Sequence, residues 1–152
     1  MTADRGSRKF HLLVVEDNPG DIALLRLALE DAQLDCELTL IDDGSDALAF
    51  LERRGKYADL PAPDLAILDL NVPKCDGLEI LEAMRANRAF ADLPVAVLSS
   101  SSSPRDRAQM EVFRIGRYIT KPPDLDEYLK IGQIVKELLI HSTSSRTATE
   151  TA

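Results

Sequence analysis

Five short segments of largely apolar residues recur along the chain, each bounded by polar residues, glycine or proline. They span residues 11–15, 36–41, 65–68, 95–98 and 118–120. Apolar runs of this length are typical of strands that are buried on both faces, as in a parallel sheet covered by helices. The third run leads directly into Asp69 and is enclosed by Pro63 and Pro73, so it predicts the strand around which the sheet is built.

Between these segments, apolar residues return at steps of three and four, which is the period of a helix that packs one face on a sheet. The helical stripes cover residues 22–32, 47–51, 78–88, 104–113 and 125–139. Pro19 and Pro104 suit the first turn of the helices that they begin. The last stripe also contains Ile131 and Ile134, which make its apolar surface wider than one sheet contact requires. Residues 53–63 predict an irregular surface loop.

Five strands that alternate with five helices predict an α/β fold. Right-handed crossovers favour the flavodoxin-like (βα)5 arrangement, with a five-stranded parallel sheet in the order 2-1-3-4-5 and helices on both faces. We expect one domain over residues 10–140, between a disordered N-terminus of residues 1–9 and a disordered C-terminal tail of residues 141–152.

Composition and charge narrow the possible functions. Eighteen basic and 26 acidic residues give a net charge of −8, which disfavours nucleic-acid binding. The longest early apolar run is too short for a signal peptide or a membrane span, so we expect a cytoplasmic protein without a membrane partner. Cys36 and Cys75 form neither a CxxC pair nor a cluster with histidine, and this favours reduced thiols.

Four of the five predicted strands end on chemically useful side chains. These are Glu16 and Asp17, Asp69, Ser99, and Lys121. Each of them alone has an ordinary structural explanation, such as a helix cap, a turn or a solvated surface group. Because the carboxyl ends of parallel strands meet at the same edge of a sheet, we expect all five side chains to lie close together.

Three carboxylates at one edge repel one another unless a cation or a lysine offsets their charge. Oxygen ligands without histidine or thiolate favour Mg²⁺, which retains waters for an incoming phosphate. Asp69 is then a candidate nucleophile, while Lys121 and the hydroxyl of Ser99 face the phosphoryl oxygens. Asn71 offers a backbone carbonyl to the metal.

These residues, in this order, resemble the receiver domains of two-component response regulators, over about residues 10–139. The resemblance implies that Asp69 is phosphorylated by a histidine kinase and that Mg²⁺ is held by Glu16, Asp17, Asp69 and the Asn71 carbonyl. It also implies a cis peptide bond between Lys121 and Pro122. Tyr118 stands where the family has its switch aromatic, which responds to movement of the Ser99 hydroxyl.

Within this family, the segments 15–21 and 118–128 look most like single-domain regulators that serve phytochrome-type, light-sensing histidine kinases. Two departures from the family pattern are Ser99, where threonine is commoner, and Pro123 after Pro122. Serine is less constrained than threonine at its first side-chain torsion, so the switch is expected to be looser.

We expect no output domain after the last helix, so signalling should proceed through protein contacts. Single-domain members often form homodimers through the fourth helix, the fifth strand and the fifth helix, here the surface between Ala108 and Leu139. Ile131 and Ile134 fit such a dimer, and core filling explains them nearly as well.

The main alternative is an aspartyl-phosphate phosphatase of the haloacid dehalogenase type, which uses a similar set of side chains and Mg²⁺. Such enzymes have a second aspartate two residues after the nucleophile, and this chain has Asn71 there. Their nucleophile also follows the first strand, whereas Asp69 follows the third. A phosphate-independent scaffold is a further alternative, against which the intact constellation argues.

Overall fold

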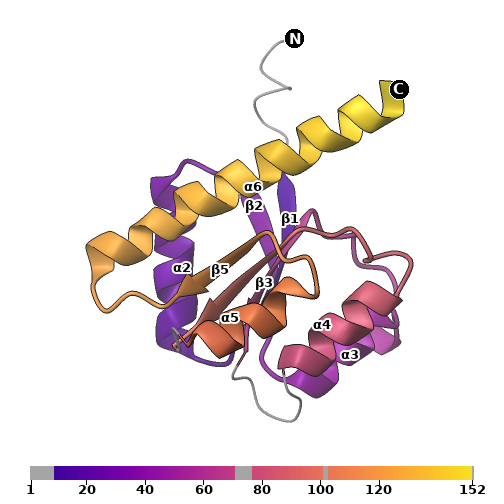
Figure 1. The fold of residues 1–152 in the computed structure, drawn as a ribbon, viewed down its shortest axis with the longest axis horizontal. Helices are drawn as coiled ribbons and strands as arrows, with labels where there is room; N and C mark the ends of the chain where they lie inside the picture. The colour runs from indigo at the N-terminus through magenta and orange to yellow at the C-terminus, as the bar shows by residue number, and fades with distance from the viewer. Residues whose placement is uncertain (1–8, 71–76, 101–102, 152) are drawn as a thin grey trace.

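The computed structural model describes residues 9–70, 77–100 and 103–151. Five parallel strands form its sheet: β1 (Phe10–Val15), β2 (Cys36–Ile41), β3 (Leu65–Asp69), β4 (Val95–Ser99) and β5 (Arg117–Thr120). The strand order is β2-β1-β3-β4-β5, as predicted from the sequence (Figure 1). β3 therefore lies in the middle of the sheet, and both of its neighbours are parallel to it.

Helices cover both faces of the sheet. They are α2 (Pro19–Asp31), α3 (Gly44–Leu51), α4 (Gly77–Ala86), α5 (Pro104–Glu111) and α6 (Leu125–Thr151). The apolar side chains of α2 and α6 pack on one face, and those of α3, α4 and α5 pack on the other. Burial of these stripes against the sheet is the main force that holds the layers together.

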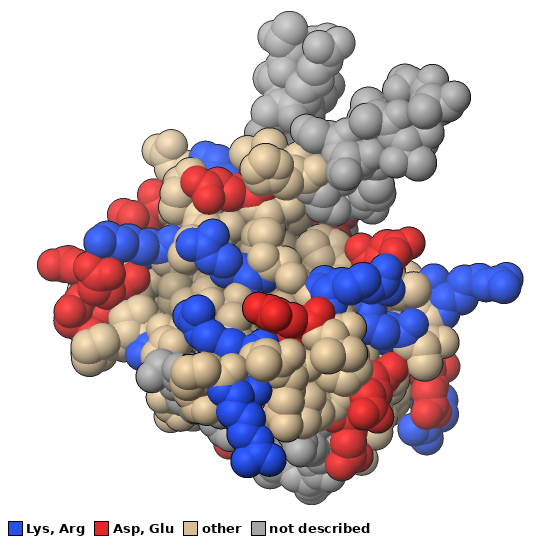
Figure 2. All heavy atoms as spheres, in the orientation of Figure 1, with Lys and Arg blue, Asp and Glu red and all other residues tan. Residues whose placement is uncertain are grey.

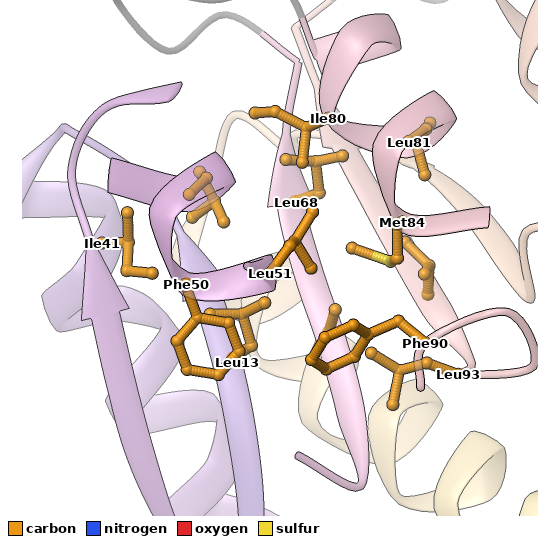
Figure 3. Packing of buried hydrophobic residues seen from close by; sticks show 14 of the residues in the cluster. Leu13, Ile41, Phe50, Leu51, Leu68, Ile80, Leu81, Met84, Phe90 and Leu93 are labelled. Carbon is orange, nitrogen blue, oxygen red and sulfur yellow. The ribbon is translucent and has the colours of Figure 1, made fainter. Parts of the chain in front are cut away.

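The core on the α3 and α4 side is formed by interleaved aromatic and aliphatic residues (Figure 3). The ring of Phe50 lies 6.0 Å from that of Phe90, between their centroids, and 5.7 Å from that of Tyr57. Tyr57 belongs to a short 3-10 helix, Gly55–Tyr57, in the segment that the sequence predicted to be an irregular loop. Burial of the Tyr57 ring anchors this connection to the core.

α2 and α6 approach each other very closely on the opposite face. A Cβ atom added to Gly132 would overlap the carbonyl oxygen of Ala28. Ile131 is only 1% exposed within this layer, and Ile134 packs against it while partly buried. Core filling therefore accounts for Ile131. This residue no longer supports the expectation of a dimer.

Two helix ends differ from the sequence-based expectations. α5 ends at Glu111, so Val112 lies outside the helix and is 76% exposed. α6 continues as a helix to Thr151, although disorder was predicted from His141 onward (Figure 1). The buried side of α6 ends at Leu139, and beyond it the helix extends past the sheet without further core contacts among the described side chains. Extension of a helix that is already formed avoids the cost of nucleation.

The surface carries side chains of both signs. Figure 2 shows acidic and basic residues on the same face of the molecule. Within the described residues, none of the helices combines the length and the apolar character that crossing a membrane requires.

Candidate functional site

The ends of the parallel strands bring the candidate residues to one edge of the sheet. Register pairs Val15 with Leu68, Asp69 with Leu98, and Ser99 with Thr120. Two backbone hydrogen bonds continue the ladder into the loops, from the N–H of Glu16 to Ile41 and from the N–H of Lys121 to Ser99. The sheet itself thus sets the spacing of the side chains that follow each strand.

The site contains buried polar side chains. Glu16 and Asp69 are each 4% exposed and Ser99 is 2% exposed, whereas Asp17 is exposed at the rim. Carboxylate oxygens of Glu16, Asp17 and Asp69 all lie within 4.8 Å of one another. This spacing and this all-oxygen donor set fit a hard divalent cation such as Mg²⁺.

Lys121 is the cation in contact with this cluster. Its Nζ atom lies 2.9 Å from Asp69 Oδ2, 2.8 Å from Asp21 Oδ2, and 3.3 and 3.4 Å from the two carboxylate oxygens of Glu16. Burial lowers the pKa of Lys121, but hydrogen bonds with Asp21 and Asp69 outweigh this effect and raise the pKa above its ordinary value. Lys121 is therefore charged throughout the physiological range.

Glu16 has the opposite environment. Its burial and the neighbouring Asp69 carboxylate raise the pKa of Glu16 to about 8, and Lys121 offsets only part of this shift. Two buried carboxylates with a single nearby lysine therefore hold a proton near neutral pH. A divalent cation would relieve the same repulsion between the carboxylates that raises this pKa.

Asp21 joins the site although the sequence analysis did not select it. It lies in the first turn of α2, where its side chain is 24% exposed and reaches Lys121. The signal in the sequence is weak, since acidic residues are common in the first turn of a helix for reasons of the helix dipole. Its place four residues after Asp17, close to the end of the first strand, is the feature that could have pointed to the site.

Ser99 and Tyr118 lie on neighbouring strands. Ser99 ends β4, and Tyr118 of β5 is partly buried and packs against the core of the α3 and α4 side. The guanidinium carbon of Arg107 in α5 lies 5.2 Å from the centroid of the Tyr118 ring. The ring thus connects the sheet edge to α5, and its role as a switch stays a prediction.

Two of the sequence-based expectations concern the loops after the strands. Asn71 and Cys75 lie outside the residues that the structure describes. The expected cis bond between Lys121 and Pro122 is wrong for this structure, because the described residues contain no cis peptide. The trans form is the more stable one for bonds to proline unless the surroundings lock the cis form, and only the family resemblance had favoured cis.

Comparisons with known proteins agree with this geometry. A family model described as "Response regulator receiver domain" matches residues 12–132. Response regulator Rcp1 of Synechocystis sp. is 33% identical over 133 residues, which cover 88% of this chain and 90% of Rcp1.

Solved structures give the same result. The phosphorylated cyanobacterial phytochrome response regulator RcpA matches with a TM-score of 0.80 and 34% identity, over 88% of this chain and 95% of RcpA. The Mn²⁺-bound form of Rcp1 matches with a TM-score of 0.77 and 35% identity, over 84% of this chain and 91% of that one. The family match, over residues 12–132, includes the end of each strand that contributes to the acidic edge.

Proposed function

Because this chain belongs to the response regulator receiver domains, whose function is phosphoacceptor signalling, we propose that Asp69 is its phosphoacceptor and that a histidine kinase is its donor. The family match supports this interpretation and gives no support to the phosphatase alternative. Phosphatase chemistry of that type also needs a second aspartate where this chain has Asn71.

Its position supports Asp69 above the other carboxylates. It ends the central strand and lies 2.9 Å from the ammonium of Lys121 and beside the Glu16 and Asp17 carboxylates. In the transfer, an Asp69 oxygen bonds to phosphorus while the phosphorus–nitrogen bond of the donor phosphohistidine breaks. The leaving imidazole nitrogen takes a proton from water, and Lys121 offsets charge on the phosphoryl oxygens.

Mg²⁺ is the cation that we propose for the acidic cluster. Glu16, Asp17 and Asp69 would hold it, together with the backbone carbonyl of Asn71, for which the family resemblance is the support. A bound Mg²⁺ supplies charge neutralisation for the phosphoryl oxygens. The Mn²⁺-bound form of the related Rcp1 is consistent with a divalent ion in this fold.

Ser99 and Tyr118 are the proposed switch pair. The Ser99 hydroxyl would donate to a phosphoryl oxygen, and Tyr118 would respond to its movement by turning inward. Their support is position: Ser99 ends β4, the strand next to β3, and Tyr118 lies on the adjacent strand β5, where it pairs with Val97. Since Tyr118 contacts Arg107, a rotation of its ring would reach the surface of α5.

The same relatives support our proposal for the partners. Similarity to Rcp1 and to the phytochrome regulator RcpA supports a phytochrome-type kinase as donor, and hence action in the cytoplasm. Output would proceed through protein contacts, with homodimerisation through the surface between Ala108 and Leu139 as the first candidate. Exposed Val112 is the described apolar residue on that surface that most needs a partner.

The decisive test of the phosphoacceptor uses a small phosphodonor. The wild-type chain, Asp69→Asn and the control Asp59→Asn are incubated with acetyl phosphate and Mg²⁺, and intact mass is measured. Asp59 is an exposed loop residue, so its variant matches the loss of one carboxylate. We expect one added phosphoryl group on the wild type and on Asp59→Asn, and none on Asp69→Asn. Equal labelling of all three proteins would reject Asp69.

The donor and the dimer need their own tests. Phosphotransfer from a phytochrome-type kinase, compared with transfer from other histidine kinases of the same cell, should be fastest from the phytochrome-type kinase. Light scattering with and without beryllofluoride should show a larger dimer fraction in the activated protein. Equal transfer from all kinases, or an unchanged oligomeric state, would reject the respective proposal.

A further inference from the structure

Asp21 is a carboxylate of the site that the proposed function does not use. Its Oδ2 atom accepts a hydrogen bond of 2.8 Å from Lys121 Nζ, which is slightly shorter than the 2.9 Å bond from the same atom to Asp69. Asp21 is not one of the three residues whose carboxylate oxygens cluster closely enough to share a cation. Its contact is with the lysine.

The backbone of Asp21 is held on two sides. Its N–H donates to Asn18 Oδ1 over 3.1 Å, and its carbonyl oxygen accepts from the hydroxyl of Tyr128 over 3.4 Å. Tyr128 is only 2% exposed and lies in α6. The cap of α2 and a buried side chain of α6 thus fix the position from which Asp21 reaches Lys121.

The charges at this edge compete. The single ammonium of Lys121 contacts carboxylates of Glu16, Asp21 and Asp69 at the same time. A divalent cation would be held by Glu16, Asp17 and Asp69 and would relieve the repulsion between them, and Asp21 lies outside that set. A phosphoryl group on Asp69 needs that same ammonium for its oxygens. Asp21 therefore competes with the phosphoryl group for the positive charge of Lys121.

We infer that Asp21 is a positioning residue that holds Lys121 at the edge of α2 and limits how strongly the lysine binds a phosphoryl group on Asp69. The inference rests on the proposed role of Asp69. Loss of the Asp21 charge frees the ammonium for the phosphoryl oxygens and strengthens the activated state. Because the pair is partly exposed, the effect is moderate and is screened by salt.

The test measures binding of beryllofluoride, which combines with an aspartate oxygen as an acyl phosphate analogue. The chain has no tryptophan, so titration calorimetry at saturating Mg²⁺ replaces fluorescence. We compare wild type with Asp21→Asn, which retains an acceptor oxygen but loses the charge, and with Asp21→Glu, which retains the charge. Glu30→Gln removes an exposed carboxylate from the other end of α2 and serves as the control.

We expect Asp21→Asn to bind beryllofluoride about three- to tenfold more tightly than wild type at low salt, and the difference to shrink as ionic strength rises. Asp21→Glu should bind closer to wild type, and Glu30→Gln should equal it. A merely structural role for Asp21 would weaken binding or leave it unchanged, and would give no dependence on salt.

The outcomes separate this inference from the proposed function. Unchanged or weaker binding by Asp21→Asn, with normal binding by the wild type, would overturn the role of Asp21 alone. Failure of the wild type to bind beryllofluoride would overturn the proposed phosphoacceptor. Equal tightening by Asp21→Asn and Glu30→Gln would show a general charge effect and would likewise overturn the inference. Mg²⁺ titration of each variant checks that the cation site is intact.

Discussion

Lys121 Nζ lies 2.9 Å from Asp69 Oδ2, although the two residues are 52 positions apart in the sequence. β4 stands between the strands that carry them, so the long side chain of Lys121 crosses the end of one strand to reach Asp69. Both groups are largely buried, with side chains 17% and 5% exposed. In the metal-free protein, Lys121 is therefore the main counter-charge of the acidic edge among the described residues.

Replacement of Lys121 by methionine should destabilise the metal-free protein. The variant retains most of the apolar stem but leaves the carboxylates of Glu16 and Asp69 buried without a cation, and we expect the free energy of unfolding near pH 8 to fall by about 2 kcal/mol or more. Urea unfolding in EDTA measures this loss, and saturating Mg²⁺ should recover much of it. Lys130→Met, which breaks an exposed pair with Glu127, is the control. Equal losses in the two variants would contradict this assignment of Lys121.

The raised pKa of Glu16 makes the stability of the metal-free protein depend on pH. Between the ordinary glutamate pKa of 4.5 and the folded value of about 8, the native state binds a proton that the unfolded chain has released. The Glu16 contribution to stability is thus fully present below the lower value and is lost as pH rises through the upper one. Glu16→Gln should remove this loss.

Urea unfolding in EDTA at two pH values tests this dependence. Near pH 5, close to the ordinary glutamate pKa, the wild type and Glu16→Gln should differ little, and near pH 9 the variant should be more stable by more than about 1 kcal/mol. The comparison between proteins cancels the titration of groups that they share. A difference of the same size at both pH values would show that the amide acts by something other than the charge of Glu16.

Much of the site could be predicted because strand ends are easy to find. The apolar runs before Glu16 and Asp69 locate the edge, and a parallel sheet leaves no choice about which ends meet. Family resemblance then supplied roles that no pattern contains, such as that of Tyr118. This is why the sheet order and the grouping of Glu16, Asp17, Asp69 and Lys121 agree with the sequence-based expectation.

The remaining features depend on tertiary contacts. Asp21 looks like an ordinary acidic residue in a first helical turn, and only the path of the Lys121 side chain makes it part of the site. Apolar Val112 and Phe113 predicted a longer α5, but Arg114 has a positive φ of 55° in the turn that follows the helix. From the sequence, Ile131 could face either a partner or the core. Because α6 approaches α2 closely, Ile131 is buried in the core.

Arg85 of α4 should contribute to stability through hydrogen bonds that its side chain donates to backbone carbonyls. Its Nε atom donates to the carbonyl of Phe113 over 2.7 Å, and its Nη1 atom donates to those of Leu93 over 2.8 Å and Phe90 over 3.2 Å. Arg85→Met removes donors that the loop before β4 and the turn after α5 share. We expect the free energy of unfolding to fall by about 1–3 kcal/mol, since partly buried carbonyls lose their partners.

Hydrogen exchange can locate this effect. In Arg85→Met, the amides of the turn after α5 and of the loop before β4 should exchange faster than those of α2, which Arg85 does not touch. Arg88→Met, which replaces an exposed arginine in the turn after the same helix, provides the matched control and should leave both regions unchanged. Uniform acceleration over the whole chain would show that Arg85 stabilises the fold without acting on these segments.

Gly132 of α6 should not tolerate even a methyl group. In an isolated helix, alanine is more favourable than glycine by about 1 kcal/mol. Here the added Cβ would overlap the backbone carbonyl of Ala28, and backbone moves less readily than a side chain. We therefore expect Gly132→Ala to lower the free energy of unfolding by about 1–3 kcal/mol, because α2 and α6 must separate to admit it.

Gly20→Ala is the matched control for this substitution, because Gly20 is also helical and its added Cβ would meet only the side-chain oxygen of Asn18, at 3.1 Å. In parallel urea unfolding experiments, Gly20→Ala should lower the free energy of unfolding clearly less than Gly132→Ala does. The separation of the helices also shifts α2, which carries the Asp21 that reaches Lys121, so Gly132→Ala should alter beryllofluoride affinity as well. A stability gain in Gly132→Ala would show that the two helices are less tightly packed than the structure indicates.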